Sequence, residues 1–225
     1  MNGKLFIVPT PIGNLDDITF RAVQILQEVD LILAEDTRTT GVLLKKYKIK
    51  TNCTAYHIHN EHSKVTLQID FLRAGKNLAL VSDAGTPAIS DPGFLLLREA
   101  IQAGIEVCCL PGPTAFVPAL VMSGLPSDNF SFYGFLPSKK GRKTKLLEMK
   151  LDKRTLVLYE SPHRVIKFAD EILANFGNIK VAYAREISKL HETIFRGSAE
   201  LLIEHLKTAL VKGEYVFILD NKHGI

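Results

Sequence analysis

LALVSDAGTPAISDPGF, residues Leu78 to Phe94, passes from an apolar run through a polar loop into a second apolar segment. An apolar run of strand length followed by turn residues predicts a buried strand and then a helix. Asp91 is placed to cap that helix, with Pro92 at its first position. In an open α/β sheet, ligands bind at the carboxyl end of such a strand.

The charge of this loop predicts the kind of ligand. The loop holds two carboxylates and no Lys or Arg, whereas a phosphate-binding loop normally adds a cation to its backbone N–H groups. A neutral or cationic ligand with hydroxyl or ammonium groups suits an acidic lining better. Because a helix cap accounts for only one Asp, we expect Ser82–Thr86 to contact the ligand.

Strand and helix patterns alternate on both sides of this stretch. Further apolar strands are predicted at residues 4–10, 31–34, 54–58 and 106–110. The alternation predicts a parallel sheet with helices on both faces. It stops at Pro111–Pro113, so we expect an N-terminal α/β domain over 1–111 and a C-terminal α/β domain over 112–225.

The C-terminal half follows a different pattern. Strands at 180–184 and 192–196 have no helix between them, which predicts a mixed sheet. A helix over 115–122 is apolar almost all round, so we expect it to be buried between the domains, with Thr114 as its cap.

A basic segment spans residues 138–154. It contains eight Lys and Arg residues and two acidic residues, so its net charge exceeds the net charge of +4 of the whole chain. Such runs are usually solvated, but this concentration also predicts contact with a polyanion such as RNA. We assign phosphate contacts to Lys139, Lys140, Arg142 and Lys143 and expect them to be exposed and mobile, because they lack the apolar spacing of a helix face.

Two further polar loops follow predicted strands. Glu35, Asp36 and Arg38 are placed for chemistry or for orienting a substrate, and an alternative interpretation makes Asp36 or Thr37 a helix cap. The second loop is Glu160–Arg164.

Histidines 57, 59 and 62 lack the spacing of a metal site, and a loop before a helix capped by Ser63 explains most of them, so no metal is predicted. The three cysteines, Cys53, Cys108 and Cys109, form neither a metal pattern nor a disulfide framework, and we expect them to be buried. No apolar run reaches membrane-spanning length and no leader is evident, which predicts a cytoplasmic protein without a membrane partner.

Several polar motifs occur together in a fixed order: PTPIGNL (9–15), AEDTR (34–38), HNE (59–61), VSDAGTPAISDPG (81–93), PGPTA (111–115), GFLPSKKGR (134–142), YESPHR (159–164), REISKLHE (185–192) and RG (196–197). They span nearly the whole chain. This series resembles the tetrapyrrole methylase superfamily, in particular the bacterial branch that 2′-O-methylates a cytidine of 16S ribosomal RNA.

The resemblance implies two α/β domains with S-adenosylmethionine in a cleft between them, usually in a homodimer. The partner would be 16S rRNA or the small ribosomal subunit, with Arg38 and Arg164 joining the basic segment as RNA contacts. By position in the motifs, the cofactor-binding residues would be Asp83, Ala84, Gly85, Thr86, Thr114, Ala115, Glu160 and Glu186.

A ribose hydroxyl needs a positioned base to become a good nucleophile. The candidates are Glu35, Asp36, Glu160 and His163, and the sequence does not distinguish them. Two alternatives stay open: methylation of a small tetrapyrrole or corrinoid, and a non-catalytic RNA-binding assembly factor. The basic segment favours RNA over a tetrapyrrole, which needs an apolar trough and few cations.

Overall fold

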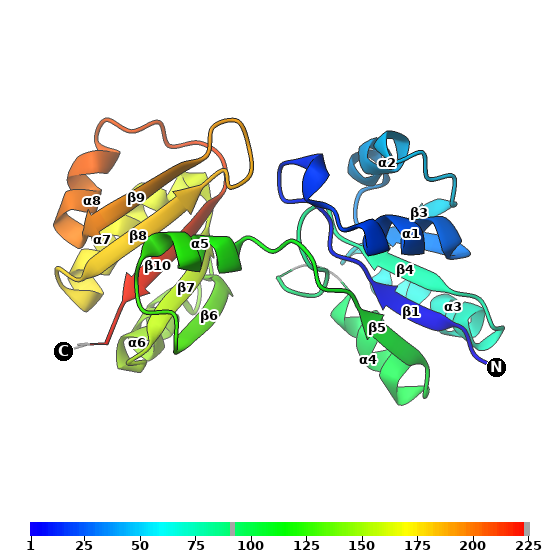
Figure 1. Cartoon of the computed structure of the whole chain (residues 1–225). Helices are drawn as coiled ribbons and strands as arrows, with labels where there is room; N and C mark the ends of the chain where they lie inside the picture. The colour runs from blue at the N-terminus through cyan, green and yellow to red at the C-terminus, as the bar shows by residue number, and fades with distance from the viewer. Residues whose placement is uncertain (91–92, 223–225) are drawn as a thin grey trace. The chain divides into compact units, whose positions relative to one another are not determined.

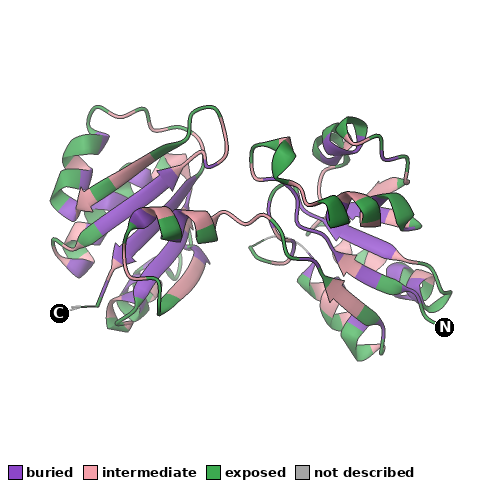
Figure 2. Cartoon of the chain, viewed as in Figure 1, coloured by how far each residue is buried: buried purple, intermediate pink, exposed green. Residues whose placement is uncertain are grey.

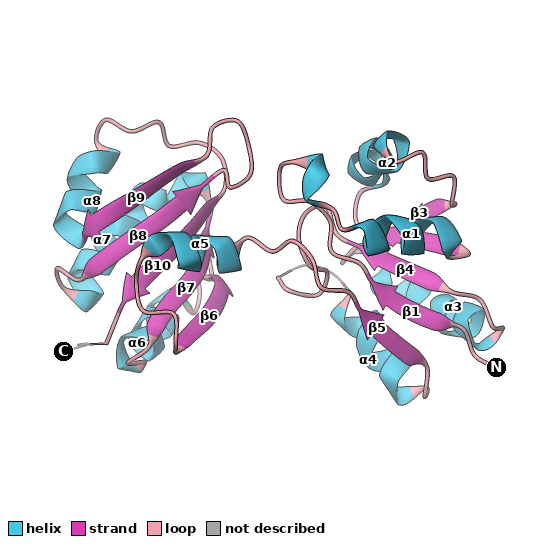
Figure 3. Cartoon of the chain, viewed as in Figure 1, coloured by secondary structure: helices cyan, strands magenta, loops and turns pink. Residues whose placement is uncertain are grey.

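The chain divides into two compact units, Met1–Thr114 and Ala115–Ile225 (Figure 1). The computed structural model describes residues 1–90 and 93–222. Each unit contains one five-stranded sheet with helices (Figure 3). The prediction of two α/β units, the first with a parallel sheet and the second with a mixed one, is confirmed.

The N-terminal sheet has the order β3-β2-β4-β1-β5, and all its strand pairs are parallel. Its strands are β1 Lys4–Ile7, β2 Leu31–Ala34, β3 Cys53–Ala55, β4 Leu78–Val81 and β5 Glu106–Cys109. Its helices are α1 Phe20–Glu28, α2 Thr37–Lys46, α3 Glu61–Arg73 and α4 Phe94–Gln102, with a 3₁₀ turn η1 at Leu15–Asp17. The central strand β4 is therefore the apolar run of the opening motif.

Strand β4 is buried on both faces (Figure 2). Leu78 and Leu80 belong to a cluster that includes residues of α3 and α4, whereas Ala79 and Val81 belong to one that includes residues of α1 and α2. Successive side chains of a strand point to opposite faces, so helices cover both sides of the sheet. Burial of each leucine stabilises the fold by roughly 1.5–3 kcal/mol.

The helix starts of this unit correct two expectations. Asp36 caps α2 by accepting the N–H of Arg38, as the alternative interpretation held. The prediction of Ser63 as the cap of α3 is wrong, because Asn60 is the N-cap residue and the helix begins at Glu61. The Oδ1 of Asn60 accepts the N–H of His57, which closes the turn before the helix. Helix α4 starts after Gly93, and its predicted cap at Asp91 and Pro92 lies outside the described residues.

The prediction that all three cysteines are buried is wrong for Cys109, which is exposed, while Cys53 and Cys108 are partly buried. Cys109 ends β5, an edge strand that pairs on one side only. Within residues 1–90 and 93–222, no helix is both long and apolar enough to cross a membrane.

The C-terminal sheet has the order β6-β7-β10-β8-β9, with β6 parallel to β7 and the other pairs antiparallel. Its strands are β6 Phe130–Phe135, β7 Thr155–Glu160, β8 Lys180–Arg185, β9 Thr193–Ser198 and β10 Tyr215–Asp220. Its helices are α5 Phe116–Ser123, α6 Arg142–Leu151, α7 Val165–Phe176 and α8 Ala199–Leu206, with a 3₁₀ turn η2 at Pro162–Arg164. Strands β6, β7 and β8 run in one direction, so their carboxyl ends share one edge of the sheet.

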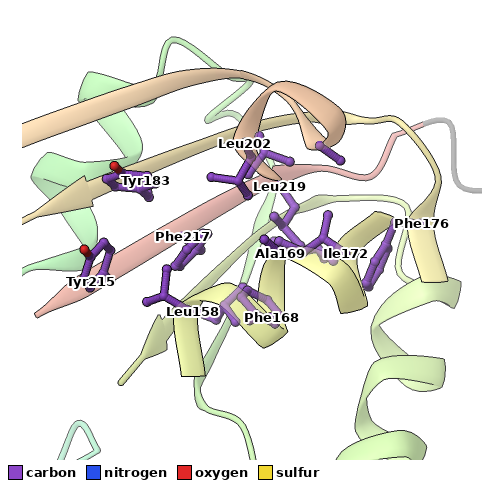
Figure 4. Packing of buried hydrophobic residues seen from close by; sticks show 14 of the residues in the cluster. Leu158, Phe168, Ala169, Ile172, Phe176, Tyr183, Leu202, Tyr215, Phe217 and Leu219 are labelled. Carbon is purple, nitrogen blue, oxygen red and sulfur yellow. The ribbon is translucent and has the colours of Figure 1, made fainter. Parts of the chain in front are cut away.

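Helices α6, α7 and α8 cover one face of this sheet. Figure 4 shows Phe168, Ile172 and Phe176 of α7 beside Leu158 of β7 and Phe217 of β10. The rings of Phe168 and Phe217 meet edge to face with their centroids 5.2 Å apart, a favoured aromatic geometry.

Helix α5 packs against β7, β8, β9 and β10. Ala119 and Leu120 are buried, whereas Val117 and Val121 are exposed, so α5 buries only one of its faces within the C-terminal unit. The predicted cap is wrong, because Ala115 is the N-cap residue and provides no side-chain bond.

The basic segment differs most from its prediction. Instead of a mobile loop, much of it is helix α6, and Arg142, Leu146 and Met149 form its buried face. These positions have the i, i+4, i+7 spacing of an apolar stripe. Sequence reasoning missed the stripe because its first member is an arginine.

Candidate functional site

The loop after β4 is held by backbone bonds to the loop after β1. Thr10 and Gly85 each donate an N–H to the other's carbonyl oxygen, and both distances are 2.9 Å. Gly85 has φ of +82°, a conformation that a side chain would strain. The hydroxyl of Thr10 donates to the carbonyl of Ser82 at 2.9 Å, so this corner is fixed before any ligand binds.

Two hydroxyls expected to contact a ligand bond within the protein instead. Ser82 is buried, and its Oγ donates to the carbonyl of Gly85 at 3.4 Å. Thr86 donates to the carbonyl of Pro113 at 3.2 Å. Asp83 and Ala84 are the exposed residues between them. The acidic tip of the loop is therefore the part best placed to meet a ligand.

Asp83 also connects the carboxyl ends of β4 and β2. Its Oδ1 accepts the N–H of Asp36 at 3.1 Å. Hydrogen bonds from Arg38 lower the pKa of Asp36 to about 2, and Arg38 Nη2 lies 2.6 Å from Asp36 Oδ2. Asp36 is therefore a helix cap paired with a cation. A carboxylate held in this way is a weak base.

Among residues 1–90 and 93–222, neither Glu35 nor Asp83 forms an ion pair of this kind, although the charge of Arg38 also acts on Asp83. Partial burial, followed by the charge of Asp83, raises the pKa of Glu35. Burial also raises the pKa of Asp83, although its bond from the Asp36 N–H partly offsets the rise. A raised pKa marks a carboxylate that takes up a proton more readily. Glu35 and Asp83 thus form an acidic pair at the ligand edge.

The histidines lie at the neighbouring end of β3. His57 Nε2 lies 3.1 Å from Asn60 Nδ2 and is partly buried, whereas His59 and His62 are exposed. Among residues 1–90 and 93–222, no three His, Cys, Asp or Glu side chains form a group that could hold a metal ion.

The C-terminal unit has its own charged site at the end of β7. Glu160 Oε2 accepts from Arg142 Nη2 at 2.8 Å, and Oε1 accepts from Arg164 Nε at 2.6 Å and from the Ser161 N–H at 2.8 Å. Arg142 Nη2 also lies 2.7 Å from Glu171 Oε2. The side chains of Arg142 and Glu160 are only 4% and 0% exposed. This is a buried ion-pair network joining α6, β7 and α7.

The network corrects three predicted roles. Glu160 was expected as a base or a cofactor contact, but both its oxygens already accept bonds and neither is exposed. Arg142 was expected to bind phosphate, but its guanidinium is buried against two carboxylates. Arg164 is partly exposed and paired with Glu160, so an RNA contact would use only its remaining N–H groups.

The remaining basic and catalytic candidates lie on the surface. Lys139 and Lys140 are exposed just before α6, Lys143 is exposed in its first turn, and His163 is exposed on η2. Arg38 is 90% exposed at the start of α2. Thr114 and Ala115 are partly buried just before α5.

Glu186 is the first residue of the loop that follows β8, and its side chain is held by hydrogen bonds. It has a positive φ of +54° and accepts bonds from Lys189 Nζ and from the Glu214 N–H, both at 2.9 Å. Gly213 has φ of +85°, a conformation that favours glycine, and a Cβ there would lie 2.5 Å from the Glu186 carboxyl carbon. The neighbouring Arg185, which sequence analysis did not single out, has a buried Nε without a hydrogen-bond partner among the described residues.

The sequence matches those of known proteins over most of its length. A model of the Tetrapyrrole (Corrin/Porphyrin) Methylases matches residues 4–202. "Ribosomal RNA small subunit methyltransferase I" of Halalkalibacterium halodurans is 48% identical over 97% of this chain and 76% of its own length. The protein of the same name from Thermotoga maritima is 46% identical over 98% of this chain and 99% of its own length.

The fold also recurs in solved structures. Uroporphyrin-III C-methyltransferase from Thermus thermophilus, crystallised with S-adenosyl homocysteine, superposes with a TM-score of 0.66. It is 18% identical and covers 97% of this chain and 98% of its own. The match over residues 4–202, together with relatives of this identity, shows that the chain belongs to the tetrapyrrole (corrin/porphyrin) methylase family.

Proposed function

We propose that this protein is an S-adenosylmethionine-dependent methyltransferase that 2′-O-methylates a cytidine ribose of 16S ribosomal RNA. The observation that carries the proposal is the similarity, at 48% and 46% identity over nearly the whole chain, to two proteins named small-subunit rRNA methyltransferases. The surface lysines of the C-terminal unit agree with a polyanionic substrate.

The acidic edge of the N-terminal sheet supports the cofactor assignment. S-adenosylmethionine has a sulfonium, an ammonium and ribose hydroxyls, which suit Asp83 and the backbone of Ala84 and Gly85. Burial raises the pKa of Glu35 and of Asp83, and a neighbouring carboxylate adds to the rise in each, an effect that a cationic ligand would relieve. Thr114, Ala115 and Thr86, whose hydroxyl can still accept a hydrogen bond, complete the proposed lining. When bound, the cofactor supplies an electrophilic methyl group.

The base is best assigned to Glu35. Asp36 is neutralised by Arg38, and Glu160 is enclosed by two guanidinium groups. That leaves Glu35 and His163 of the four candidates. Glu35 has the raised pKa that favours proton uptake, so we assign it to accept the proton of the ribose 2′-hydroxyl. His163, exposed on η2, is the alternative.

Lys139, Lys140 and Lys143 are proposed to contact RNA phosphates, together with the exposed Arg38. Because ribosomal RNA is the proposed substrate, we place the reaction in the cytoplasm. We also propose a homodimer, which the family resemblance implies.

A methyl-transfer assay with competing substrates tests the proposal. Purified protein and S-adenosylmethionine carrying a labelled methyl group are incubated with small ribosomal subunits, free 16S rRNA or uroporphyrinogen. We expect label in the RNA of one or both ribosomal substrates. Label in uroporphyrinogen alone would favour the tetrapyrrole alternative, and cofactor binding without label in any substrate would favour a different acceptor.

If calorimetry detects no cofactor binding while RNA binds, the non-catalytic assembly factor is the better account. The acidic pair of Glu35 and Asp83 argues against that alternative. Two neighbouring carboxylates would weaken RNA binding rather than support it.

A further inference from the structure

One cross-strand row of the C-terminal sheet brings polar residues together at its edge. Tyr215 of β10 lies opposite Glu160 of β7 on one side and opposite Arg185 of β8 on the other, and Arg185 lies opposite Thr193 of β9. Side chains of directly opposite residues in antiparallel strands point to the same face. Glu160 is the last residue of β7 and Arg185 the last residue of β8, so this row lies directly before the loops at the carboxyl ends of both strands.

Arg185 is partly buried in this row. It lies directly opposite Tyr215, and its charge offsets part of the rise that burial causes in the pKa of Tyr215. Tyr183, two residues before Arg185, lies on the same side as Tyr215 (Figure 4). The strand register therefore places Arg185 on the same face of the sheet as these two tyrosines.

The surrounding carboxylates are already paired with other cations. Glu160 bonds to Arg142 and Arg164, as described above. Lys189 Nζ lies 2.9 Å from both Glu186 Oε1 and Glu214 Oε2. Arg185 acts on Glu186 only as the weakest of the influences that lower its pKa, behind Lys189.

The Nε of Arg185 is buried and has no hydrogen-bond partner within residues 1–90 and 93–222. A partly desolvated guanidinium with an unsatisfied buried N–H donor is costly. An incoming anion would relieve that cost and would meet the planar fork of donors that suits carboxylate and phosphate oxygens.

We infer that Arg185 binds an anionic oxygen group of a ligand at this edge of the C-terminal sheet. The inference rests on the proposed function, which provides two sources of that group: a phosphodiester of the RNA and the carboxylate of the methionine part of the cofactor. Both chemistries fit the same guanidinium, and binding measurements separate them.

The test compares Arg185→Gln with the wild type and with Arg98→Gln, which removes an exposed arginine from α4. Three quantities are measured: the thermal midpoint of the ligand-free protein, the affinity for S-adenosyl homocysteine by calorimetry, and the affinity for 16S rRNA across a salt series. Removing an uncompensated charge should leave the midpoint within a degree or two of wild type, or raise it.

If the group is a phosphodiester, RNA affinity falls about tenfold or more and its salt dependence flattens by about 0.7–0.9, while affinity for S-adenosyl homocysteine is kept. If it is the cofactor carboxylate, affinity for S-adenosyl homocysteine falls about tenfold or more and the salt dependence is unchanged. Arg98→Gln should change neither affinity.

Two results would overturn the inference. One is that both affinities of Arg185→Gln stay within twofold of wild type. The other is a clear loss of ligand-free stability, up to failure to fold, which would show that Arg185 has a structural partner. The wild-type measurements test the proposed function separately. If the wild type binds neither ligand, the proposed function and the role of Arg185 are both refuted. If the wild type binds normally and Arg185→Gln binds equally well, only the role of Arg185 is refuted.

Discussion

Replacing Arg142 with alanine tests whether the start of the basic segment serves folding rather than RNA binding. Arg142 Nη2 lies 2.8 Å from Glu160 Oε2 and 2.7 Å from Glu171 Oε2. Without Arg142, Glu160 keeps only Arg164 as an ion-pair partner among the described residues, with a side chain that is 0% exposed. Removing one partner of a buried pair costs about 3–5 kcal/mol.

Glu171 is 18% exposed and also lies 3.7 Å from Lys167, so water and a second cation limit its share of that cost. We therefore assign most of the loss to Glu160. Arg142→Ala should lower the free energy of unfolding of the C-terminal unit by about 3 kcal/mol. A change of this size is a large fraction of the roughly 5–15 kcal/mol that stabilises a typical domain.

Urea denaturation followed by far-UV circular dichroism measures the change, since the chain has no tryptophan to report by fluorescence. Lys143→Ala is the matched control, because Lys143 is the next residue of α6 and is exposed. Its loss should stay within about 0.5 kcal/mol. Equal stabilities for the two variants, or a fully stable Arg142→Ala protein with weakened RNA binding, would refute the assignment of Arg142 to the network.

Three further predictions concern the proposed site. Asp83→Asn should weaken the affinity for S-adenosyl homocysteine, measured by calorimetry, by about 1.5–3 kcal/mol for one lost charge-assisted bond, and an unchanged affinity would move the ligand elsewhere. The double variant Lys139→Ala/Lys140→Ala should flatten the salt dependence of RNA binding by about 0.7–0.9 per lost contact and leave cofactor affinity unchanged; a loss of cofactor affinity would mean that the segment covers the cofactor site. The base must be deprotonated to act, and the pKa of Glu35 is raised above its ordinary value of 4.5, so kcat/KM should begin to fall on the acid side at a pH above 4.5. Glu35→Gln should lose most of the activity and this acid limb of the pH profile. An acid limb that persists in the variant would point to His163 as the base.

The alternation of strands and helices could be predicted because it depends on local hydrophobic pattern. Strands β2 and β4 match their predicted ranges residue for residue. Both are buried on two faces, so their residues are apolar without interruption. The caps were less predictable, because Asn60 and Ser63 are both good N-cap residues and the choice depends on the bond from the His57 N–H to Asn60.

The candidate site was predicted in position but not in detail. A hydroxyl in a strand-end loop looks the same in sequence whether it meets a ligand or, like Thr86, a carbonyl of the protein. Likewise, the charge of Arg142 suggested a solvated phosphate contact. Its partners are 18 and 29 residues away in sequence, on β7 and α7. Only tertiary structure brings them together.

Nucleoside analysis by mass spectrometry tests the central claim most directly. Small-subunit RNA is incubated with the protein and S-adenosylmethionine, digested to nucleosides and compared with RNA incubated without the protein. The account predicts a gain of 2′-O-methylcytidine, absent when Glu35→Gln replaces the wild type. A methyl group found on a base, on another ribose or on no nucleoside at all, while wild type still binds the cofactor, would contradict it.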